Sequence, residues 1–295
     1  MRDFNAYYRP KTFGEMLGNH ITTSIISKEI ATGKLPNAYI LVAPPGNGKT
    51  TLGRIISREL GVESPIEINA AVNNGVEDVR AINEDASYLS FDGKRKIYLI
   101  DEAQAMTKAA FQASLKLMEE PPEQTLFILC TTDLNKIPPA IRSRAQIFYL
   151  SEVPPDEIAE RLGIICNDLD IEFEPEALDY IAKGCMGCIR EAIQKLEQIS
   201  ILGKVTLESV KQVLPDLDIF RDILVNRNLK RVQELSYTSV SIDSLIKEAV
   251  NLAIDNKIPR KVAVGLVKLR PVLNTPFDPQ IVQLYLEEAF NGSNS

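Results

Sequence analysis

Residues 38–60 constrain the fold of this chain more than any other stretch. They read AYILVA, then PPGNGKTT, then LGRIISREL. The first part is a short apolar run, and Leu52, Ile55 and Ile56 recur in the third part with helical spacing, so the stretch predicts a buried strand, a loop and an amphipathic helix. In that context, a Gly-rich loop that closes with Gly-Lys-Thr is typical of loops whose backbone N–H groups surround the phosphates of ATP or GTP.

The loop departs from the phosphate-binding pattern at one position, because Ala43 stands where the pattern has its first glycine. Ala43 ends the apolar run, where extended backbone suits it, so we expect little effect. Lys49 is expected to reach the β- and γ-phosphates, and Thr50 to place its hydroxyl on Mg²⁺. A Gly/Pro turn with an unrelated lysine is the alternative. The predicted nucleotide-binding residues of the loop are Pro45, Gly46, Asn47, Gly48, Lys49, Thr50 and Thr51.

Asp101 and Glu102 follow a second apolar run, KIYLI at residues 96–100. Adjacent carboxylates are poorly placed for packing there, whereas nucleotide hydrolysis needs an Asp near the metal and a Glu that orients or deprotonates water. Asp101 is therefore a predicted Mg²⁺ ligand together with Thr50. Taken alone, the pair also fits a solvated strand end. Combined with the loop, it predicts hydrolysis of the nucleotide and not binding only.

Two further apolar runs, at residues 125–130 and 146–150, alternate with helical patterns. Strands buried on both faces and joined by helices indicate an α/β fold, in which a parallel sheet has helices on both faces and function lies at the carboxyl ends of the strands. The rest of the chain has helical periodicity only. We expect an α/β core at 1–152, a small helical lid domain at 153–215 and a third, all-helical domain at 216–295.

Composition excludes several classes of protein. Of the 295 residues, 45% are hydrophobic and 25% charged. No run approaches the ~18 apolar residues of a membrane span, and the N-terminal stretch is polar, so we expect a cytoplasmic protein without membrane contact. The net charge of −7 argues against a surface that is basic throughout, but it leaves room for a local nucleic-acid track. Cys185 and Cys188 form a CxxC without a second pair, which favours small buried side chains over a zinc site.

Several segments together resemble the AAA+ clamp-loader ATPases. This family includes the bacterial polymerase III gamma/tau ATPase, the small subunits of replication factor C and the ATPase subunit of phage clamp loaders. The similar segments cover residues 7 to about 200 in the family's order. They are Tyr8-Arg9-Pro10, APPGNGKTT, residues 66–70 and 76–80, SFDGKRKIYLIDEAQAMT, MEEPPEQTLFILCTT, IPPAIRSRAQIF and GCIREAI.

The resemblance implies roles for further residues. Thr132 matches sensor 1, which contacts the γ-phosphate or the attacking water, and Arg190 matches the lid arginine known as sensor 2. Arg144 matches the arginine finger that completes a neighbouring subunit's site. The segment beside adenine is matched by Tyr8, Arg9, Pro10, Leu17 and Gly18. A helix-surface charge at Arg190 and ordinary core packing of Tyr8 are the alternatives.

The family's partners are implied in the same way. Its members form an open five-subunit spiral that sets a sliding clamp around primer–template DNA, and residues 216–295 would be the oligomerisation collar. Asn74, Gly75 and Val76 open a helix whose amides would meet DNA phosphates, with added charge from Arg80 and Lys108 and without sequence specificity. A solvent-facing helix is the alternative there.

The clamp contact is less specific. The sequence ASYLSF at residues 86–91 places three large apolar side chains near a helix end, which fits either a plug for a hydrophobic pocket of the clamp or core packing.

Departures from the family narrow the expectation. Ser-Arg-Ala replaces the family's Ser-Arg-Cys at residues 143–145, which leaves the finger intact, and the four-cysteine zinc module of gamma/tau is missing. With the short length and SFDGKRKIYLIDE, this favours the phage type, acting in the host cytoplasm. Two rivals are a non-hydrolysing structural subunit, disfavoured by the complete set of site residues, and a AAA+ motor that translocates DNA or remodels initiators. Whether five identical chains assemble, or four with a different subunit, stays open.

Overall fold

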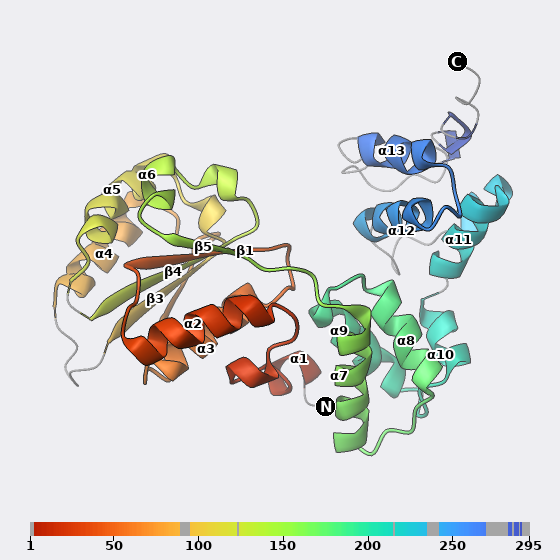
Figure 1. Ribbon diagram of the computed structural model, residues 1–295, viewed down its shortest axis with the longest axis horizontal. Helices are drawn as coiled ribbons and strands as arrows, with labels where there is room; N and C mark the ends of the chain where they lie inside the picture. The colour runs from red at the N-terminus through yellow and green to blue at the C-terminus, as the bar shows by residue number, and fades with distance from the viewer. Residues whose placement is uncertain are drawn as a thin grey trace. The chain divides into compact units, whose positions relative to one another are not determined.

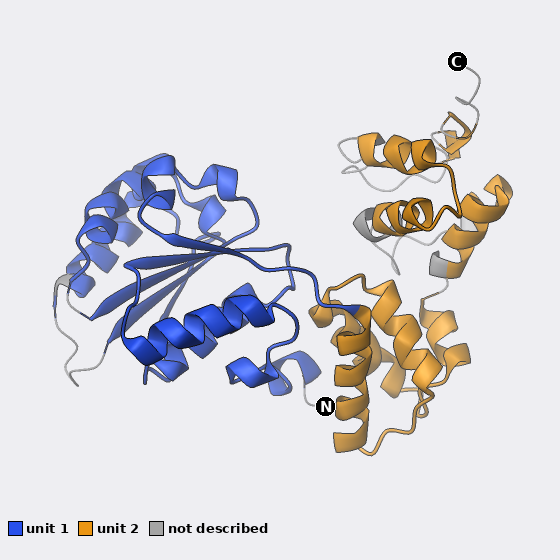
Figure 2. Ribbon diagram, in the orientation of Figure 1, with its two compact units in different colours: residues 1–154 blue, residues 155–295 orange. Residues whose placement is uncertain are grey.

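The computed structural model describes residues 3–88, 95–122, 124–214, 216–234, 242–269 and 283–290 except 285 and 289. Its chain divides into two compact units, residues 1–154 and 155–295 (Figure 2). We describe each unit by itself. The division of the second unit into a lid and a collar remains a prediction.

Unit 1 is built on a five-stranded parallel sheet in the order β2-β3-β4-β1-β5 (Figure 1). Four strands match the four apolar runs of the sequence, and β2 adds a fifth at the edge. Strand β2 escaped prediction because most of its residues are exposed, so it has no buried apolar run. The strands are β1 (Ala38–Val42), β2 (Ile66–Asn69), β3 (Lys96–Asp101), β4 (Thr125–Thr131) and β5 (Gln146–Tyr149).

Helices cover both faces of this sheet, as predicted (Figure 1). On one face, Tyr39 and Leu41 of β1 belong to a core with α2 (His20–Thr32) and α3 (Lys49–Glu59). On the other face, Ile40 belongs to a core with three helices. These are α4 (Val76–Ser87), α5 (Lys108–Glu119) and α6 (Pro139–Arg142). Alternation of buried side chains along β1 therefore explains why its sequence is continuously apolar. The short elements of this unit are α1 (Phe4–Tyr7), η1 (Phe13–Glu15), η2 (Ala103–Ala105) and η3 (Leu134–Lys136).

Unit 2 is helical in its described residues, apart from one isolated parallel bridge between Phe173 and Val205. Its first four helices bury residues such as Leu162, Leu178 and Leu196 among themselves. These helices are α7 (Pro155–Asp168), α8 (Pro175–Gly184), α9 (Ile189–Ser200) and α10 (Leu207–Val213). The remaining elements surround a separate apolar cluster. They are α11 (Asp216–Asn226), η4 (Leu229–Glu234), α12 (Ile242–Ile254) and α13 (Arg260–Leu269).

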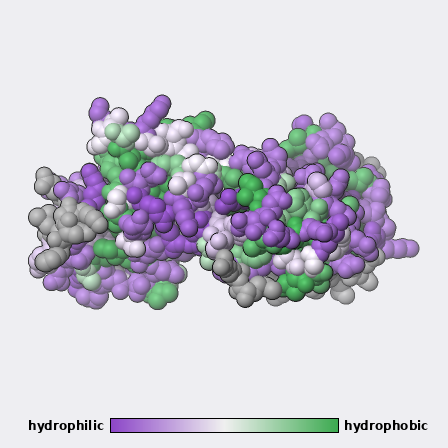
Figure 3. Space-filling model, turned by 90° about the horizontal axis from the view of Figure 1, so that it is seen from below, coloured by the Kyte–Doolittle hydropathy of each residue, from purple (hydrophilic) through white to green (hydrophobic). Residues whose placement is uncertain are grey.

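Figure 3 shows the molecular surface seen from below relative to Figure 1. Hydrophilic residues cover most of the face in view, and apolar residues form separate small patches. Among the described residues, no helix is both long enough and apolar enough to cross a membrane.

Candidate active site

The loop between β1 and α3 has the backbone that its glycines predict. Gly46 and Gly48 adopt left-handed φ angles of 80° and 81°. The left-handed φ at Gly48 favours glycine, and a Cβ atom there would lie 2.6 Å from Cε of Met16, so the end of that side chain would have to shift. The helix α3 begins at the next residue, Lys49, which places its positive N-terminal end at the loop.

Lys49 and Asn47 are polar side chains buried in this loop. Lys49 is 6% exposed, and its Nζ donates to the backbone oxygens of Ala43 at 2.8 Å and Pro44 at 3.0 Å. Asn47 is 4% exposed, and its Nδ2 is buried without a hydrogen-bond partner in the described structure. An unpaired buried donor costs ~1–3 kcal/mol, which a phosphate oxygen would recover. The loop therefore fits an anionic ligand by its amide donor as well as by its lysine.

Ala43 keeps the end of the strand intact. Its N–H donates to the oxygen of Thr131 at 3.2 Å, which extends the pairing of β1 with β4 by one bond. Its side chain is buried in the apolar core on the α3 face. Alanine thus serves at this position as a strand residue.

Thr50 and Asp101 meet across the junction of α3 and β3. The Thr50 hydroxyl donates to Oδ2 of Asp101 at 2.8 Å, and the N–H of Glu102 donates to Oδ1 at 3.0 Å. A hydroxyl and a carboxylate in this arrangement are the protein oxygens that hold Mg²⁺ beside nucleotide phosphates. The donor set at this junction therefore fits the predicted metal.

Glu102 has a left-handed backbone, with φ at 53°. Such a conformation in a residue other than glycine costs of order 1–3 kcal/mol and clusters at functional sites. The side-chain amide of Gln104 donates from Nε2 to the Glu102 carboxylate. Its Oε1 accepts from the Thr131 hydroxyl at 2.8 Å and from the Thr132 N–H at 3.2 Å. The sequence analysis did not predict a role for Gln104. Its polar side chain lies between Ala103 and Ala105, directly after the carboxylate pair, and this position could have marked it as a candidate.

Thr131 and Thr132 divide between the core and the surface. Thr131 is fully buried, and its hydroxyl also contacts the backbone of Asp133, 3.1 Å from both N and O. Thr132 is exposed, as the predicted sensor must be to meet a ligand. The structure thus brings Glu102 and the predicted sensor into one hydrogen-bonded network at the strand ends.

The segment predicted to lie beside adenine precedes α2. Tyr8 ends α1 and makes edge-to-face contact with Tyr7, with ring centroids 4.9 Å apart. Further along, Arg58 of α3 donates to the oxygen of Lys11 at 3.0 Å, so the chain after Arg9 and Pro10 runs beside that helix. Leu17 follows Met16, which packs on the loop, and Gly18 is buried with a left-handed φ of 59°.

The two predicted arginines lie in different units. Arg144 follows α6 in unit 1, where it forms an ion pair with Glu119 and donates to the oxygen of Ala140 at 2.7 Å. Its side chain is 36% exposed. Arg190 lies exposed in the first turn of α9 in unit 2. Their roles at a nucleotide remain predictions.

Among the residues predicted to meet DNA, Asn74 joins two helix starts. Its oxygen accepts from the N–H of Thr107, the N-cap of α5, at 3.2 Å. The helix α4 begins at Val76, as predicted, so the N-termini of α4 and α5 lie side by side. Lys108, the first residue of α5, is exposed there.

One detail of that prediction needs correction. The N–H of Gly75 is bonded to Oδ2 of Asp78 at 3.0 Å, so this amide already has an acceptor within the chain. Arg80 forms an ion pair with Glu77 at 2.6 Å, and both side chains are exposed. Acidic residues in the first turn stabilise a helix N-terminus but oppose an incoming phosphate.

The segment proposed as a clamp plug is only partly described. Ala86 is buried against α5, which agrees with core packing at that residue. Tyr88 is 65% exposed. Leu89, Ser90 and Phe91 lie outside the described residues.

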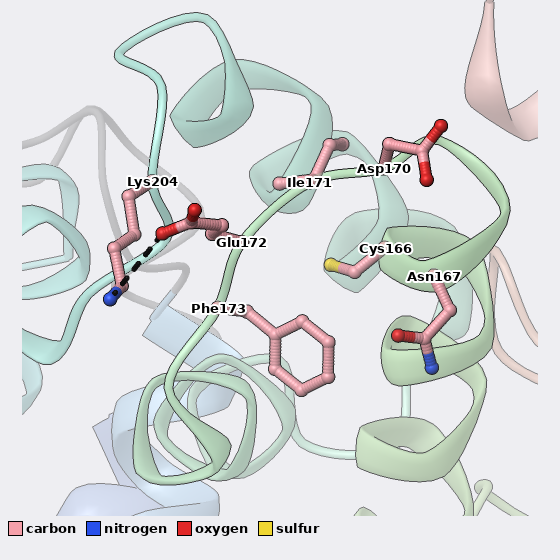
Figure 4. A pocket seen from close by; sticks show the side chains of 7 residues that line it. All are labelled: Cys166, Asn167, Asp170, Ile171, Glu172, Phe173 and Lys204. Carbon is pink, nitrogen blue, oxygen red and sulfur yellow. Dashed lines mark ion pairs between the residues drawn. The ribbon is translucent and has the colours of Figure 1, made fainter.

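The cysteines and a surface cavity lie in unit 2. Burial raises the pKa of the Cys185 and Cys188 thiols, which disfavours metal-binding thiolates. The described residues contain no group of three or more His, Cys, Asp or Glu side chains that could hold a metal. A cavity of about 420 Å³ beside the α7–α8 turn is lined by residues 166, 167, 170–173 and Lys204 (Figure 4). None of the predicted site residues lines it.

The chain matches a family model described as DNA polymerase III, delta subunit, over residues 67–154. Its fold is similar to that of the RuvB Holliday junction branch migration motor of Thermotoga maritima. The TM-score is 0.62 at 22% identity, over 84% of this chain and 88% of that one. At this identity the likeness shows the AAA+ fold alone.

Relatives in sequence are subunits of a bacterial DNA polymerase. The chain is 34% identical over 275 residues to subunit gamma/tau of Mycoplasma genitalium, covering 85% of this chain and 45% of the relative. Identity to subunit tau of Escherichia coli K12 is 31% over 236 residues, 72% of this chain and 37% of the relative. The chain thus spans less than half of these two proteins. It is 30% identical over 281 residues to subunit gamma of Buchnera aphidicola subsp. Baizongia pistaciae, covering 83% of this chain and 75% of the relative. The chain therefore belongs to the DNA polymerase III gamma/tau family.

Proposed function

We propose that this chain is an ATP-hydrolysing subunit of a sliding-clamp loader that acts in DNA replication. The observation that carries the proposal is the hydrogen bond between Thr50 and Asp101, at 2.8 Å. It joins the phosphate-binding loop to the strand end that bears Glu102, so the groups for binding and for hydrolysis lie together. A subunit with a purely structural role has no need of this arrangement.

The proposed cofactors are ATP and Mg²⁺. Lys49 and the unpaired Nδ2 of Asn47 would bind phosphate oxygens, and Thr50 with Asp101 would hold the metal. Mg²⁺ at this site would neutralise negative charge on the phosphates as the reaction proceeds. Glu102 would orient the attacking water or accept its proton.

The remaining site residues have proposed roles around the nucleotide. The exposed side chain of Thr132 would contact the γ-phosphate or the water, and Arg190 would act as the sensor 2 arginine at the nucleotide. The adenine would lie beside Tyr8, Arg9, Pro10, Leu17 and Gly18. The exposure of Thr132 and Arg190 supports these roles, because buried side chains would have to move to reach a ligand.

Arg144 is proposed to act in a neighbouring subunit. An arginine that stabilises transition-state charge from a second molecule contributes ~10³–10⁵ in rate for other nucleotide hydrolases. Support comes from its partly exposed position on unit 1 and from its place in the motif Ser-Arg-Ala. The isolated chain would then hold incomplete sites, and assembly into a five-subunit spiral through residues 216–295 would complete them.

The proposed partners are primer–template DNA and a ring-shaped sliding clamp. Asn74, Val76, Arg80 and Lys108 would contact phosphates at the paired starts of α4 and α5, without reading base sequence. Gly75 would join them once its N–H exchanges Asp78 for a phosphate. Tyr88, exposed after α4, is the described residue best placed for the clamp. We also propose a cytoplasmic location and a loader of the phage type. Absence of the four-cysteine module of gamma/tau from the sequence supports the phage type.

Steady-state ATP hydrolysis tests the proposal. The chain would be measured with primer–template DNA and clamp and partner subunits, together and singly, beside Glu102→Gln and Arg144→Ala. Matched controls are Glu59→Gln on α3 and Lys28→Ala on α2, which change exposed charges away from the strand ends. We expect DNA and clamp together to stimulate hydrolysis, and only the site variants to abolish it. Turnover that ignores DNA and clamp, or survives loss of Arg144, would refute the loader function.

A further inference from the structure

The side chain of Gln104 bridges two strand ends. From η2 it donates through Nε2 to the carboxylate of Glu102, which follows β3. Through Oε1 it accepts from Thr131 and Thr132, at the end of β4. The backbone N–H of Thr132 can only donate and a carboxylate can only accept, so both halves of the amide have a defined orientation. A flipped amide would place donor against donor and oxygen against oxygen.

The backbone of Glu102 makes this bridge consequential. Its φ of 53° directs the chain into η2, and its oxygen accepts from the N–H of Ala105 at 2.8 Å. With the backbone held in this way, the remaining freedom of Glu102 lies in its side-chain torsions. The hydrogen bond from the Gln104 amide restricts those torsions. Its acceptor is a carboxylate, and a hydrogen bond to an ionised group is stronger than one between two neutral groups.

Thr131 anchors the other side of the bridge. It is fully buried, and its hydroxyl also contacts the backbone of Asp133. Gln104 is therefore fixed to a part of the core, whereas Glu102 and Thr132 are partly accessible. An anchored amide can transmit the position of β4 to the carboxylate.

We propose that Gln104 is a positioning residue, which ties the carboxylate of Glu102 to the Thr131–Thr132 end of β4. Gln104 would thereby keep the water-orienting carboxylate of Glu102 at a fixed position relative to Thr132, the residue proposed to contact the γ-phosphate. This role rests on the proposed ATP hydrolysis. Gln104 does not itself touch the nucleotide; it acts through Glu102 and Thr132.

The test compares Gln104→Met with the wild-type chain in the full assembly with clamp and DNA. Methionine keeps the length of the side chain and removes all three hydrogen bonds, to Glu102, Thr131 and Thr132. We expect kcat to fall about 10–100-fold, as for other losses of orientation, while KM and the Kd of a non-hydrolysable ATP analogue change less than about threefold. Gln212→Met, at an exposed position of α10, is the matched control and should leave all three unchanged.

A second measurement does not depend on activity. Hydrogen exchange of the Thr132 amide should accelerate in Gln104→Met, because that N–H loses its acceptor. Thr131→Val should reproduce a part of both effects, and Thr131→Ser, which keeps the hydroxyl, should restore kcat. This pair retains the test if Gln104→Met folds poorly.

The outcomes separate this role from the proposed function. Normal kcat in Gln104→Met and in Thr131→Val, beside an active wild type, would overturn the role of Gln104 alone. Equal losses in kcat and nucleotide affinity would also overturn it, since they indicate general damage to the site. A wild-type chain that hydrolyses no ATP with clamp, DNA and partners would overturn the proposed function and this role with it.

Discussion

Arg144 and Glu119 form an ion pair within unit 1, between the second residue after α6 and the last residue of α5. The arginine proposed to enter a neighbouring site is thus held by a carboxylate of its own chain. Both side chains are partly exposed, at 36% and 42%. Pairs of this kind contribute ~0–1 kcal/mol, so the contact is weak enough to be exchanged for a phosphate during assembly.

The first prediction concerns Glu119→Gln. Removing the competing carboxylate should change the melting temperature by no more than a degree or two. It should lower the subunit concentration that gives half-maximal ATPase activity by about two- to fivefold, which corresponds to the free energy of a weak ion pair. Glu120→Gln, one residue later and exposed, is the control. A loss of activity as large as in Arg144→Ala would contradict the prediction, because it would mean that Glu119 holds Arg144 in its active position.

The second prediction compares Gly33 with the loop glycine Gly48, to separate the cost of backbone strain from the cost of steric contact when a side chain is added. Gly33 has a φ of 69° and open space where a Cβ atom would stand, whereas Gly48 has a φ of 81° and the Met16 side chain only 2.6 Å from that position. Gly33→Ala should therefore show the backbone cost alone, ~1–2 kcal/mol in the free energy of unfolding. Gly48→Ala should cost more and also weaken ATP binding.

Urea denaturation and nucleotide titration measure these two effects. The double variant Gly48→Ala with Met16→Ala should recover part of the additional loss, because it removes the contact and not the backbone strain. Equal stability of the two single glycine variants would show that Met16 adjusts without cost.

The third prediction is a pH dependence at the edge of the α4 face. Tyr98 of β3 donates to the carboxylate of Asp85 on α4, and this bond, followed by Lys96, holds the pKa of Asp85 below its ordinary value of 3.8. A lowered pKa in the folded state stabilises the protein above the ordinary value, and the contribution is lost as pH falls through the folded pKa.

Tyr98→Phe should therefore be less stable than the wild type at pH 7. The difference in the free energy of unfolding should persist at pH 5 and begin to shrink below about pH 4, where the carboxyl of the unfolded chain is protonated. It should vanish only below the lowered pKa of the folded state, where Asp85 is protonated in both states. Denaturation at pH 7, 5 and 3 checks this. A difference that is constant across the range would assign the cost to packing of the ring against Phe127 instead.

Local sequence predicted those parts of the site whose residues are neighbours in the chain. The loop, Thr50, Asp101 and four of the five strands follow from apolar runs, two of which lead directly into the glycine loop and the carboxylate pair. The bridge from Gln104 to Thr131 and the contact of Met16 with Gly48 join residues far apart in sequence, so they depend on the sheet order. The left-handed backbone of Glu102 was equally hidden, because glutamate has no preference for that region.

The predicted start of α4 at Val76 is confirmed, whereas the DNA contact itself stays a prediction and had left out the acidic neighbours. Periodicity marks where α4 begins, but Asp78 and Glu77 lie in the first turn beside the proposed basic contacts. A charge that pairs within the chain has to exchange its partner before it meets a phosphate. Sequence alone could not rank these competing contacts.

The last prediction follows from that competition. If Arg80 and Lys108 each neutralise one DNA phosphate, Arg80→Ala and Lys108→Ala should each reduce the slope of log affinity against log salt by about 1, equally for unrelated DNA sequences. Glu77→Gln should strengthen binding, because Arg80 then has no carboxylate to leave. Titrations of the assembled protein on primer–template DNA between 50 and 200 mM salt, with Lys28→Ala as the control, measure these slopes. Slopes unchanged in both variants would place the DNA elsewhere, whereas a loss confined to Lys108→Ala would show that Glu77 keeps Arg80 from the phosphate.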